Sequence, residues 1–168
     1  MDKIEIVKGV PTYLGSCPGR KDPARQVFHR LETLGVQAIV NLLSEDDYGK
    51  HGSPVKQDYA SLFLDSGIRD LLRFPIRDYE IPRGLEDFSR FVEMVHFRIS
   101  AGDILFIHCG AGLGRTGTLA AALVIRERGL ISTRAVELVR AARPGSVETP
   151  EQFEFLERYA RSLAERAG

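Results

Sequence analysis

The chain has 168 residues, of which 43% are hydrophobic and 27% are charged, and its 23 basic and 23 acidic residues cancel. This composition is that of one globular domain over residues 1–168, and it excludes an intrinsically disordered chain. Because the net charge is zero, nothing indicates binding to nucleic acid or to an anionic membrane, and any anion site must be local.

The N-terminal residues contain no apolar signal core, and no run approaches the roughly 18 apolar residues that span a bilayer. We therefore expect a cytoplasmic protein without membrane attachment. Its two cysteines, Cys17 and Cys109, are expected to be free thiols, because that compartment is reducing. The sequence holds no signal for the oligomeric state, and a monomer is the default expectation.

The N-terminal third of the chain predicts two short strands and a helix. Apolar residues over 4–7 and 12–15 indicate strands. Asp22 as N-cap, with Pro23 at the first helical position, predicts the start of a helix that ends at Gly35.

The middle of the chain continues this alternation. Residues 36–43 and 68–76 are rich in Ile, Val and Leu and predict strands, the first of them buried. Between them, Ser53 followed by Pro54 predicts the start of a second helix, which Gly67 ends.

The C-terminal half predicts one central strand among helices. The spacing of apolar residues indicates a helix over 84–100, and the apolar run 103–108 has the length of a central parallel strand. Further helices are predicted over 119–128, after Ser132 as a cap, and from 149 to about 164. Alternating strands and helices predict an α/β fold with a mainly parallel central sheet flanked by helices.

The strand over 103–108 leads directly into a loop that is rich in glycine. The residues at this junction are His108, Cys109, Gly110, Ala111, Gly112, Leu113, Gly114, Arg115 and Thr116. Glycines let successive backbone N–H groups turn toward one point, and the N-terminus of the following helix adds positive potential there. A planar guanidinium can bind two oxygens of one phosphoryl group. We therefore predict a phosphate-binding loop formed by residues 110–115.

Cys109 lies at the mouth of the predicted loop. The loop amides, the helix N-terminus and Arg115 all favour the thiolate over the thiol. A thiolate in line with a bound phosphoryl group can displace an alcohol or phenol and form a phosphocysteine, which water then hydrolyses. Thr116 is predicted to donate its hydroxyl to the leaving sulfur, and His108 to act as an orienting hydrogen-bond donor rather than a base.

The pattern His108-Cys109-x5-Arg115-Thr116 resembles the signature of the cysteine-based protein-tyrosine phosphatase superfamily. The resemblance covers nearly the whole chain and implies a compact dual-specificity-type phosphatase, with its site at the C-terminal edge of the sheet and no metal or organic cofactor. Two alternatives stay open. One is a glycine-rich turn with a structural cysteine, and the other is a phosphate-binding module without turnover.

The resemblance also implies a general acid on a loop about thirty residues before the cysteine. Asp78 lies in Phe74-Pro75-Ile76-Arg77-Asp78-Tyr79-Glu80-Ile81-Pro82, which is similar to that loop. Such an acid protonates the leaving oxygen and then accepts a proton from the attacking water. The alternatives are a solvated carboxylate at Asp78 and a rival acid at Glu80.

Residues 143–153 are similar to the corresponding stretch of mitotic-exit dual-specificity phosphatases. That resemblance implies that Gln152 helps to place the hydrolytic water and that Arg143 lies on the same edge of the site. The structural alternative is a capping box between Thr149 and Gln152, and the two roles are compatible.

Two residues of the loop after the first strands have open interpretations. Cys17 could capture a sulfenic acid formed on Cys109, although a plain surface-loop cysteine is the favoured interpretation. Arg20 could assist substrate binding, but a solvated side chain is the simpler prediction.

The loop between Cys109 and Arg115 carries no cation, so a second substrate phosphate would find no partner there and would be costly to bury. We therefore expect phosphotyrosine in proteins as the substrate, with weaker activity on phosphoserine and phosphothreonine. A phosphatase for lipid, nucleotide or sugar phosphates is the alternative enzyme, and a phosphoprotein-binding module is the alternative that is not an enzyme.

Overall fold

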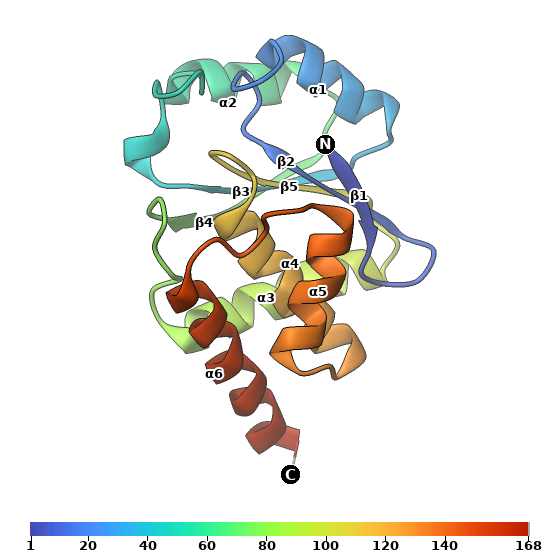
Figure 1. Ribbon diagram of the computed structural model, residues 1–168. Helices are drawn as coiled ribbons and strands as arrows, with labels where there is room; N and C mark the ends of the chain where they lie inside the picture. Colours follow the sequence, from blue (N-terminus) through green and yellow to red (C-terminus); the bar gives the residue numbers. More distant parts are fainter. Residues whose placement is uncertain (168) are drawn as a thin grey trace.

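A computed structural model describes residues 1–167 and consists of a five-stranded sheet with helices on both faces (Figure 1). The strands are β1 (Asp2–Glu5), β2 (Pro11–Ser16), β3 (Ala38–Leu43), β4 (Asp70–Ile76) and β5 (Leu105–Cys109). Their order across the sheet is β1-β2-β5-β3-β4, in which β1 pairs antiparallel with β2 and the other neighbours are parallel. The prediction of an α/β fold with a mainly parallel sheet is confirmed.

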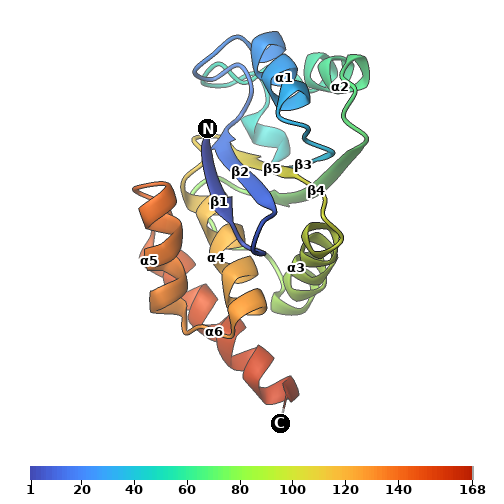
Figure 2. The ribbon, with the colours of Figure 1, turned by 90° about the vertical axis from the view of Figure 1, so that its right-hand side faces the viewer.

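The helices form two layers of unequal size. They are α1 (Ala24–Thr33), α2 (Lys56–Asp65), α3 (Leu85–Ser100), α4 (Gly114–Arg128), α5 (Ser132–Ala142) and α6 (Pro150–Ala167), with one 3₁₀ turn, η1 (Glu45–Asp47). Helices α1 and α2 cover one face of the sheet, and α3 to α6 cover the other (Figure 2). Each layer encloses its own hydrophobic cluster, and the larger cluster surrounds α4. Within residues 1–167, none of these helices has the length and apolar character that crossing a membrane requires.

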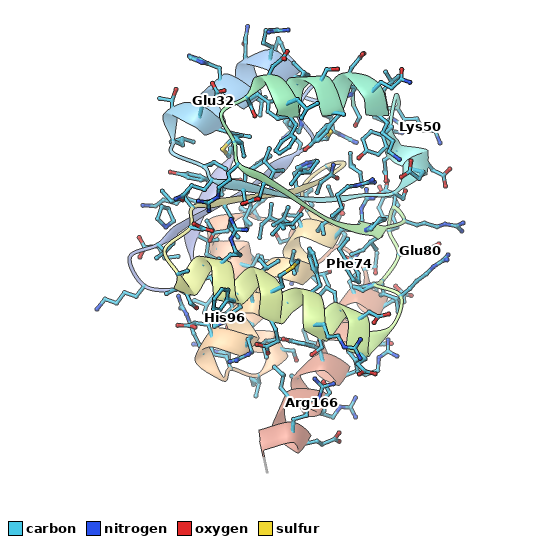
Figure 3. The ribbon with its side chains drawn as sticks, turned by 180° about the vertical axis from the view of Figure 1, so that it is seen from behind. Glu32, Lys50, Phe74, Glu80, His96 and Arg166 are labelled. Atoms are coloured by element: carbon cyan, nitrogen blue, oxygen red, sulfur yellow. The ribbon has the colours of Figure 1, made fainter. Side chains whose placement is uncertain are left out.

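Strand β5 occupies the centre of the sheet, and every one of its residues is buried. Its neighbours are β2 and β3, and the parallel register pairs Cys109 with Ser16 and His108 with Asn41. Parallel strands end at the same edge, so the loops that follow β2, β3, β4 and β5 meet there. Lys50 and Glu80, from the loops after β3 and β4, accordingly lie on the same side of the molecule (Figure 3).

The predicted cap of the first helix is wrong by one residue. Helix α1 begins at Ala24 with Pro23 as N-cap, rather than with Asp22 as the cap. The Asp22 carboxylate accepts a hydrogen bond from Arg30, at 3.3 Å, in place of a helix amide. The Asp22 side chain therefore forms an ion pair with Arg30 in the last turn of the helix and does not cap the first turn.

The predicted starts of two other helices are also wrong. Helix α2 begins at Lys56 with Val55 as N-cap, so Ser53 and Pro54 belong to the preceding loop. Helix α5 includes Ser132 as its first residue, and Ile131 is the N-cap. Neither N-cap residue donates or accepts a side-chain capping bond, so both helices depend on packing rather than on a cap.

Helix α4 begins at Gly114, five residues before the predicted start. The carbonyl of Leu113 accepts hydrogen bonds from Gly117 N at 2.8 Å and from Val147 N at 3.3 Å. Tertiary contact with the segment before α6 therefore supports a first turn that glycine propensity opposes. Strand β1 is also shifted, because it covers Asp2–Glu5 rather than residues 4–7.

Candidate active site

The phosphate loop, defined as Cys109–Arg115, connects the end of β5 to the first turn of α4. The backbone N–H of Gly112 donates to Cys109 Sγ at 3.2 Å, and Cys109 is only 2% exposed. Gly112 has φ +75°, and a Cβ atom there would lie 2.0 Å from Gly15 O. Only glycine fits this close approach, so the tight turn over the sulfur requires glycine at position 112.

Arg143 holds the phosphate loop from its outer side. Its Nε donates to Gly112 O at 2.5 Å and its Nη2 to Ala111 O at 3.1 Å, and its Nη1 pairs with the Asp2 carboxylate. In a trans peptide the N–H points opposite to the C=O. Because these two carbonyls turn toward Arg143, the N–H groups of Gly112 and Leu113 turn the other way. The predicted position of Arg143 at the edge of the site is thereby explained by a structural contact.

Arg115 is 2% exposed and is surrounded by acceptors. Its Nη1 donates to Asp47 Oδ2 and to the carbonyl of Ile76, both at 2.8 Å, and its Nη2 donates to Asp47 Oδ1 at 3.2 Å and to Asp78 Oδ1 at 2.7 Å. Two carboxylates and a carbonyl thus compensate a buried cation. They also fix the plane of the guanidinium.

Asp47 was not predicted as a site residue. It ends η1, and its Oδ2 also accepts from the N–H and the hydroxyl of Ser44, at 2.7 Å and 2.6 Å. Burial opposes the ionised carboxylate, but the hydrogen bonds from Arg115 and Ser44 outweigh burial and lower the pKa of Asp47 below its ordinary value. An acidic run such as residues 45–47 is typical of a solvated surface. The overlooked signal was its position immediately after a strand that neighbours β5.

The acid loop, defined as residues 77–84 between β4 and α3, carries Asp78 to the same guanidinium. The Asp78 side chain is 54% exposed, whereas that of Arg115 is 1% exposed. The structure therefore brings the predicted acid, the predicted clamp and the phosphate loop together. Glu80, the rival acid, lies in the same loop, and its backbone carbonyl accepts a long hydrogen bond of 3.4 Å from Gln152 Nε2.

His108 is completely buried, and its ring lies between Tyr59 and the phosphate loop. Nδ1 lies 3.3 Å from Cys109 O, and Nε2 lies 2.7 Å from Tyr59 Oη. A carbonyl oxygen only accepts, so Nδ1 carries the proton and Nε2 accepts from the tyrosine hydroxyl. Burial lowers the pKa of His108 to about 4, which keeps the ring neutral. This geometry is that of an orienting donor to the cysteine backbone.

Thr116 follows Arg115 in the first turn of α4. Its Oγ1 is buried and has no hydrogen-bond partner among residues 1–167. An unpaired buried hydroxyl is costly. Because no group in the described part of the chain binds it, the Thr116 hydroxyl is available to donate within the site. Its hydrogen bond to the sulfur stays a prediction.

Gln152 is buried and forms the capping box that was predicted as its structural role. Its backbone N–H donates to Thr149 Oγ1 at 3.2 Å, and its Oε1 accepts from the N–H groups of Glu148 at 2.9 Å and Thr149 at 3.4 Å. Its Nε2 reaches the carbonyl of Glu80, so Gln152 also connects α6 to the acid loop. Its role in placing water stays a prediction.

Glu148 is a second residue that was overlooked. Its Oε2 accepts from the N–H of Gly114 at 2.7 Å, and a Cβ atom at Gly114 would lie 2.6 Å from that oxygen. The first amide of α4 is thus already bound to a carboxylate. The local sequence pattern predicts a capping box at Thr149 and Gln152 and carries no signal for the contact of Glu148 with Gly114.

Cys17 is buried, at 1% exposure, so its interpretation as a surface-loop cysteine is wrong. Its backbone N–H donates to Gly110 O at 3.0 Å, which places this residue directly behind the phosphate loop. Burial raises the pKa of the Cys17 thiol to about 11, so it is un-ionised at neutral pH. A thiol in that state attacks a sulfenic acid slowly.

Arg20 is half-buried, and its guanidinium lies beside the phosphate loop. A Cβ atom at Gly110 would lie 3.4 Å from Arg20 Nη1 and 3.1 Å from Arg115 Nη2.

Within the described part of the chain, His, Cys, Asp and Glu side chains form no group of three or more that could hold a metal ion.

Comparison with known proteins gives a consistent assignment. A bovine protein-tyrosine phosphatase domain-containing protein 1 is 29% identical over 132 residues, which are 76% of this chain and 16% of that protein. The phosphatidylglycerophosphate phosphatase PTPMT2 of Arabidopsis thaliana is 27% identical over 148 residues, which are 88% of this chain and 59% of that protein. The chain thus spans only a part of either relative.

Among solved structures, Tk-PTP in its active form matches with a TM-score of 0.72 and 27% identity over 95% of this chain and 96% of that one. The family model described as "Polymorphic toxin system, DSP-PTPase phosphatase" matches residues 15–129, which run from the end of β2 to the end of α4 and include the phosphate and acid loops. The chain therefore belongs to this family of dual-specificity-type protein-tyrosine phosphatases.

Proposed function

We propose that this phosphatase hydrolyses phosphotyrosine in proteins through a phosphocysteine intermediate. The observation that carries the proposal is the convergence of the Cys109 sulfur, the amides of the phosphate loop, Arg115 and Asp78 at one edge of the sheet. Together they supply a nucleophile, an anion cradle and a proton donor, as displacement at phosphorus requires.

In the first step the Cys109 thiolate attacks phosphorus, an S–P bond forms and the P–O bond to the leaving group breaks. Asp78, in its protonated form, gives its proton to the leaving oxygen. In the second step Asp78 accepts a proton from water as the water oxygen attacks phosphorus and the S–P bond breaks. The products are the free phenol, inorganic phosphate and the Cys109 thiolate.

Three further residues have proposed roles in these steps. The Thr116 hydroxyl, which is buried without a partner, donates to the departing sulfur. The His108 N–H holds the backbone of the nucleophile through Cys109 O. Gln152 helps to place the attacking water while it caps α6.

An aromatic leaving group is supported by the residue next to the proposed acid. Tyr79 has φ +60° and is 65% exposed, and it lines a cavity of about 740 Å³ beside the acid loop. Apolar and charged side chains also line this cavity, namely Ile81, Leu85, Phe155, Glu80, Arg83, Glu151 and Arg158. The exposed tyrosine ring beside the acid favours an aromatic leaving group, and the cavity, which lies outside the phosphate loop, suits the residues that flank a phosphotyrosine in a protein.

A lipid phosphomonoester is the second candidate substrate. It is favoured by the similarity to a phosphatidylglycerophosphate phosphatase.

The chemical step is tested by hydrolysis of para-nitrophenyl phosphate without added metal. We expect Cys109→Ser to abolish turnover while inorganic phosphate still binds, because the amides and Arg115 remain. Vanadate should inhibit the wild type. Cys17→Ser is the matched control and should keep the activity. If the Cys109 variant retained more than a small fraction of activity, a covalent mechanism at this cysteine would be wrong.

Specificity is tested by comparing kcat/KM for a phosphotyrosine peptide, a phosphothreonine peptide and short-chain phosphatidylglycerophosphate. We expect the phosphotyrosine peptide to give the highest value. A lipid value equal to or above it would replace the protein substrate by the lipid and leave the phosphatase assignment intact.

A further inference from the structure

Arg20 brings a second guanidinium to the phosphate loop from a distant part of the sequence. It belongs to the loop between β2 and α1, whereas Arg115 follows β5. Yet Arg20 Nη1 and Arg115 Nη2 would lie 3.4 Å and 3.1 Å from the same Cβ position at Gly110. Two like charges therefore converge on the first residue after the nucleophile, in the space that Gly110 leaves open.

The backbone that carries Arg20 is held firmly on both sides. Its N–H donates to Cys17 O at 3.1 Å, and Cys17 N in turn donates to Gly110 O at 3.0 Å. On the other side, a Cβ atom at Gly52 would lie 3.1 Å from Arg20 Cα and 2.9 Å from Gly19 O, and Gly52 has φ +82°. Only glycine permits this backbone contact, so the position of Arg20 is fixed by the fold.

Arg20 forms no ion pair with an acidic side chain of residues 1–167. No carboxylate in the described part of the chain pairs with its guanidinium within 4.0 Å, although Oδ1 of the half-buried Asp47, which Arg115 binds, lies 3.9 Å from the same Cβ position at Gly110. Arg20 is half-buried. Asp47 already pairs with Arg115, so Arg20 adds a cation that this carboxylate does not pair with, and an anion bound between the two guanidinium groups would offset their repulsion.

We propose that Arg20 is a substrate-binding residue that contacts the transferring phosphoryl group beside Arg115. The ligand chemistry is a phosphomonoester dianion, and the inference rests on the proposed phosphatase function. Arg115 is already bound on both Nη atoms by Asp47 and Ile76 O, so it has limited capacity for a dianion. A second planar fork on the Gly110 side supplies the missing donors.

Binding of inorganic phosphate, measured by titration calorimetry on Cys109→Ser, tests the proposal without turnover. In that background Arg20→Ala should raise the dissociation constant about tenfold, the lower end for a charge-assisted hydrogen bond. Arg20→Lys, which keeps the charge but loses the fork, should give an intermediate value. Lys21→Ala removes the same charge one residue later and should change the constant less than twofold.

The proposal is overturned if Arg20→Ala leaves the phosphate affinity within twofold, or if Lys21→Ala weakens it equally, since the effect would then be general charge. Arg20→Gln, which keeps most of the side-chain bulk, repeats the measurement with less risk to folding, which circular dichroism checks. Because the assay needs no catalysis, an inactive wild type that still binds phosphate through Arg20 would sink the proposed function and not this inference.

The source of the phosphoryl group is distinguished by kinetics in the otherwise wild-type chain. If Arg20 binds the transferring group, Arg20→Ala should lower kcat/KM by a similar factor for a phosphotyrosine peptide and for short-chain phosphatidylinositol bisphosphate. A loss confined to the bisphosphate would mean that Arg20 binds the second phosphate of a headgroup, and the proposal as stated would be wrong.

Discussion

The phosphate loop, which carries the Arg115 guanidinium, and the acid loop, which binds it through Asp78, are built in opposite ways. The phosphate loop is almost entirely buried, and its shape is fixed by Gly112 against Gly15 and by Arg143 on its carbonyls. The acid loop is exposed from residue 77 to residue 80, and Asp78 reaches the site through one ion pair.

This difference matches the two tasks. An anion site works best when its donors are fixed before the ligand arrives, because no reorganisation is then needed. A proton donor has to change partners during the reaction and exchange its proton with solvent. The rigid phosphate loop can therefore be recognised from a sequence motif, whereas the acid can be predicted only from its distance along the chain from Cys109.

The largest effect is expected in the exposed acid loop. Asp78→Asn should lower kcat by about 10²–10⁴-fold on a phosphotyrosine peptide, the usual range for a lost general acid. The loss should shrink for para-nitrophenyl phosphate, whose leaving group needs no proton. Glu80→Gln is the matched control, and steady-state kinetics on both substrates is the measurement.

An unchanged rate for the Asp78 variant, together with a large loss for Glu80→Gln, would transfer the acid to Glu80. Equal losses on both leaving groups would instead mean that Asp78 acts by holding Arg115.

An intermediate effect is expected at Asp47, which holds the guanidinium of the buried phosphate loop. Asp47→Asn should lower kcat/KM by up to about 10²-fold, since a misoriented guanidinium no longer meets the phosphoryl oxygens. It should also lower the melting temperature, because a buried cation loses part of its compensation. Asp46→Asn removes the neighbouring exposed charge and should do neither.

A loss of activity in Asp47→Asn without a fall in phosphate affinity would argue against the positioning of Arg115. Binding of inorganic phosphate should therefore be measured beside the kinetics.

The smallest effect is expected where the two loops are joined. Gln152→Ala removes the Oε1 half of the capping box and keeps the backbone bond to Thr149 Oγ1; this should destabilise the protein by about 1 kcal/mol, and it should slow hydrolysis of the phosphocysteine more than its formation. Phosphoenzyme should then accumulate in rapid-quench experiments. Glu154→Ala, on the exposed face of α6, is the control.

A lowered melting temperature with normal phosphoenzyme turnover would reduce Gln152 to a helix cap.

The parallel sheet and the phosphate loop could be predicted from the sequence because each leaves a local pattern. The apolar run before Cys109 is continuous, as a central strand requires, and the three glycines with Arg115 form one uninterrupted motif. The capping box at Thr149 and Gln152 is likewise local, and it is formed. Residues close in sequence carry their own geometric constraint.

Asp47, Arg20 and the burial of Cys17 could not be predicted in this way. Each depends on which loops meet at the C-terminal edge of the sheet, and that follows from strand order rather than from local sequence. The starts of α1, α2 and α5 were wrong for a related reason. Capping preferences are worth about 1 kcal/mol, and packing of the helix faces decides where each helix begins.

The contacts that shape the phosphate loop come from Asp2 and Gly15 near one end of the chain, Asp47 and Asp78 in its middle, and Arg143 near the other. Only a fragment as long as residues 2–143 contains them all. We therefore expect the loop to acquire its final shape late in folding, when the distant parts of the chain have docked. A bound anion then stabilises the whole native state by mass action rather than one loop alone, and loss of either end of the chain is felt at the sulfur.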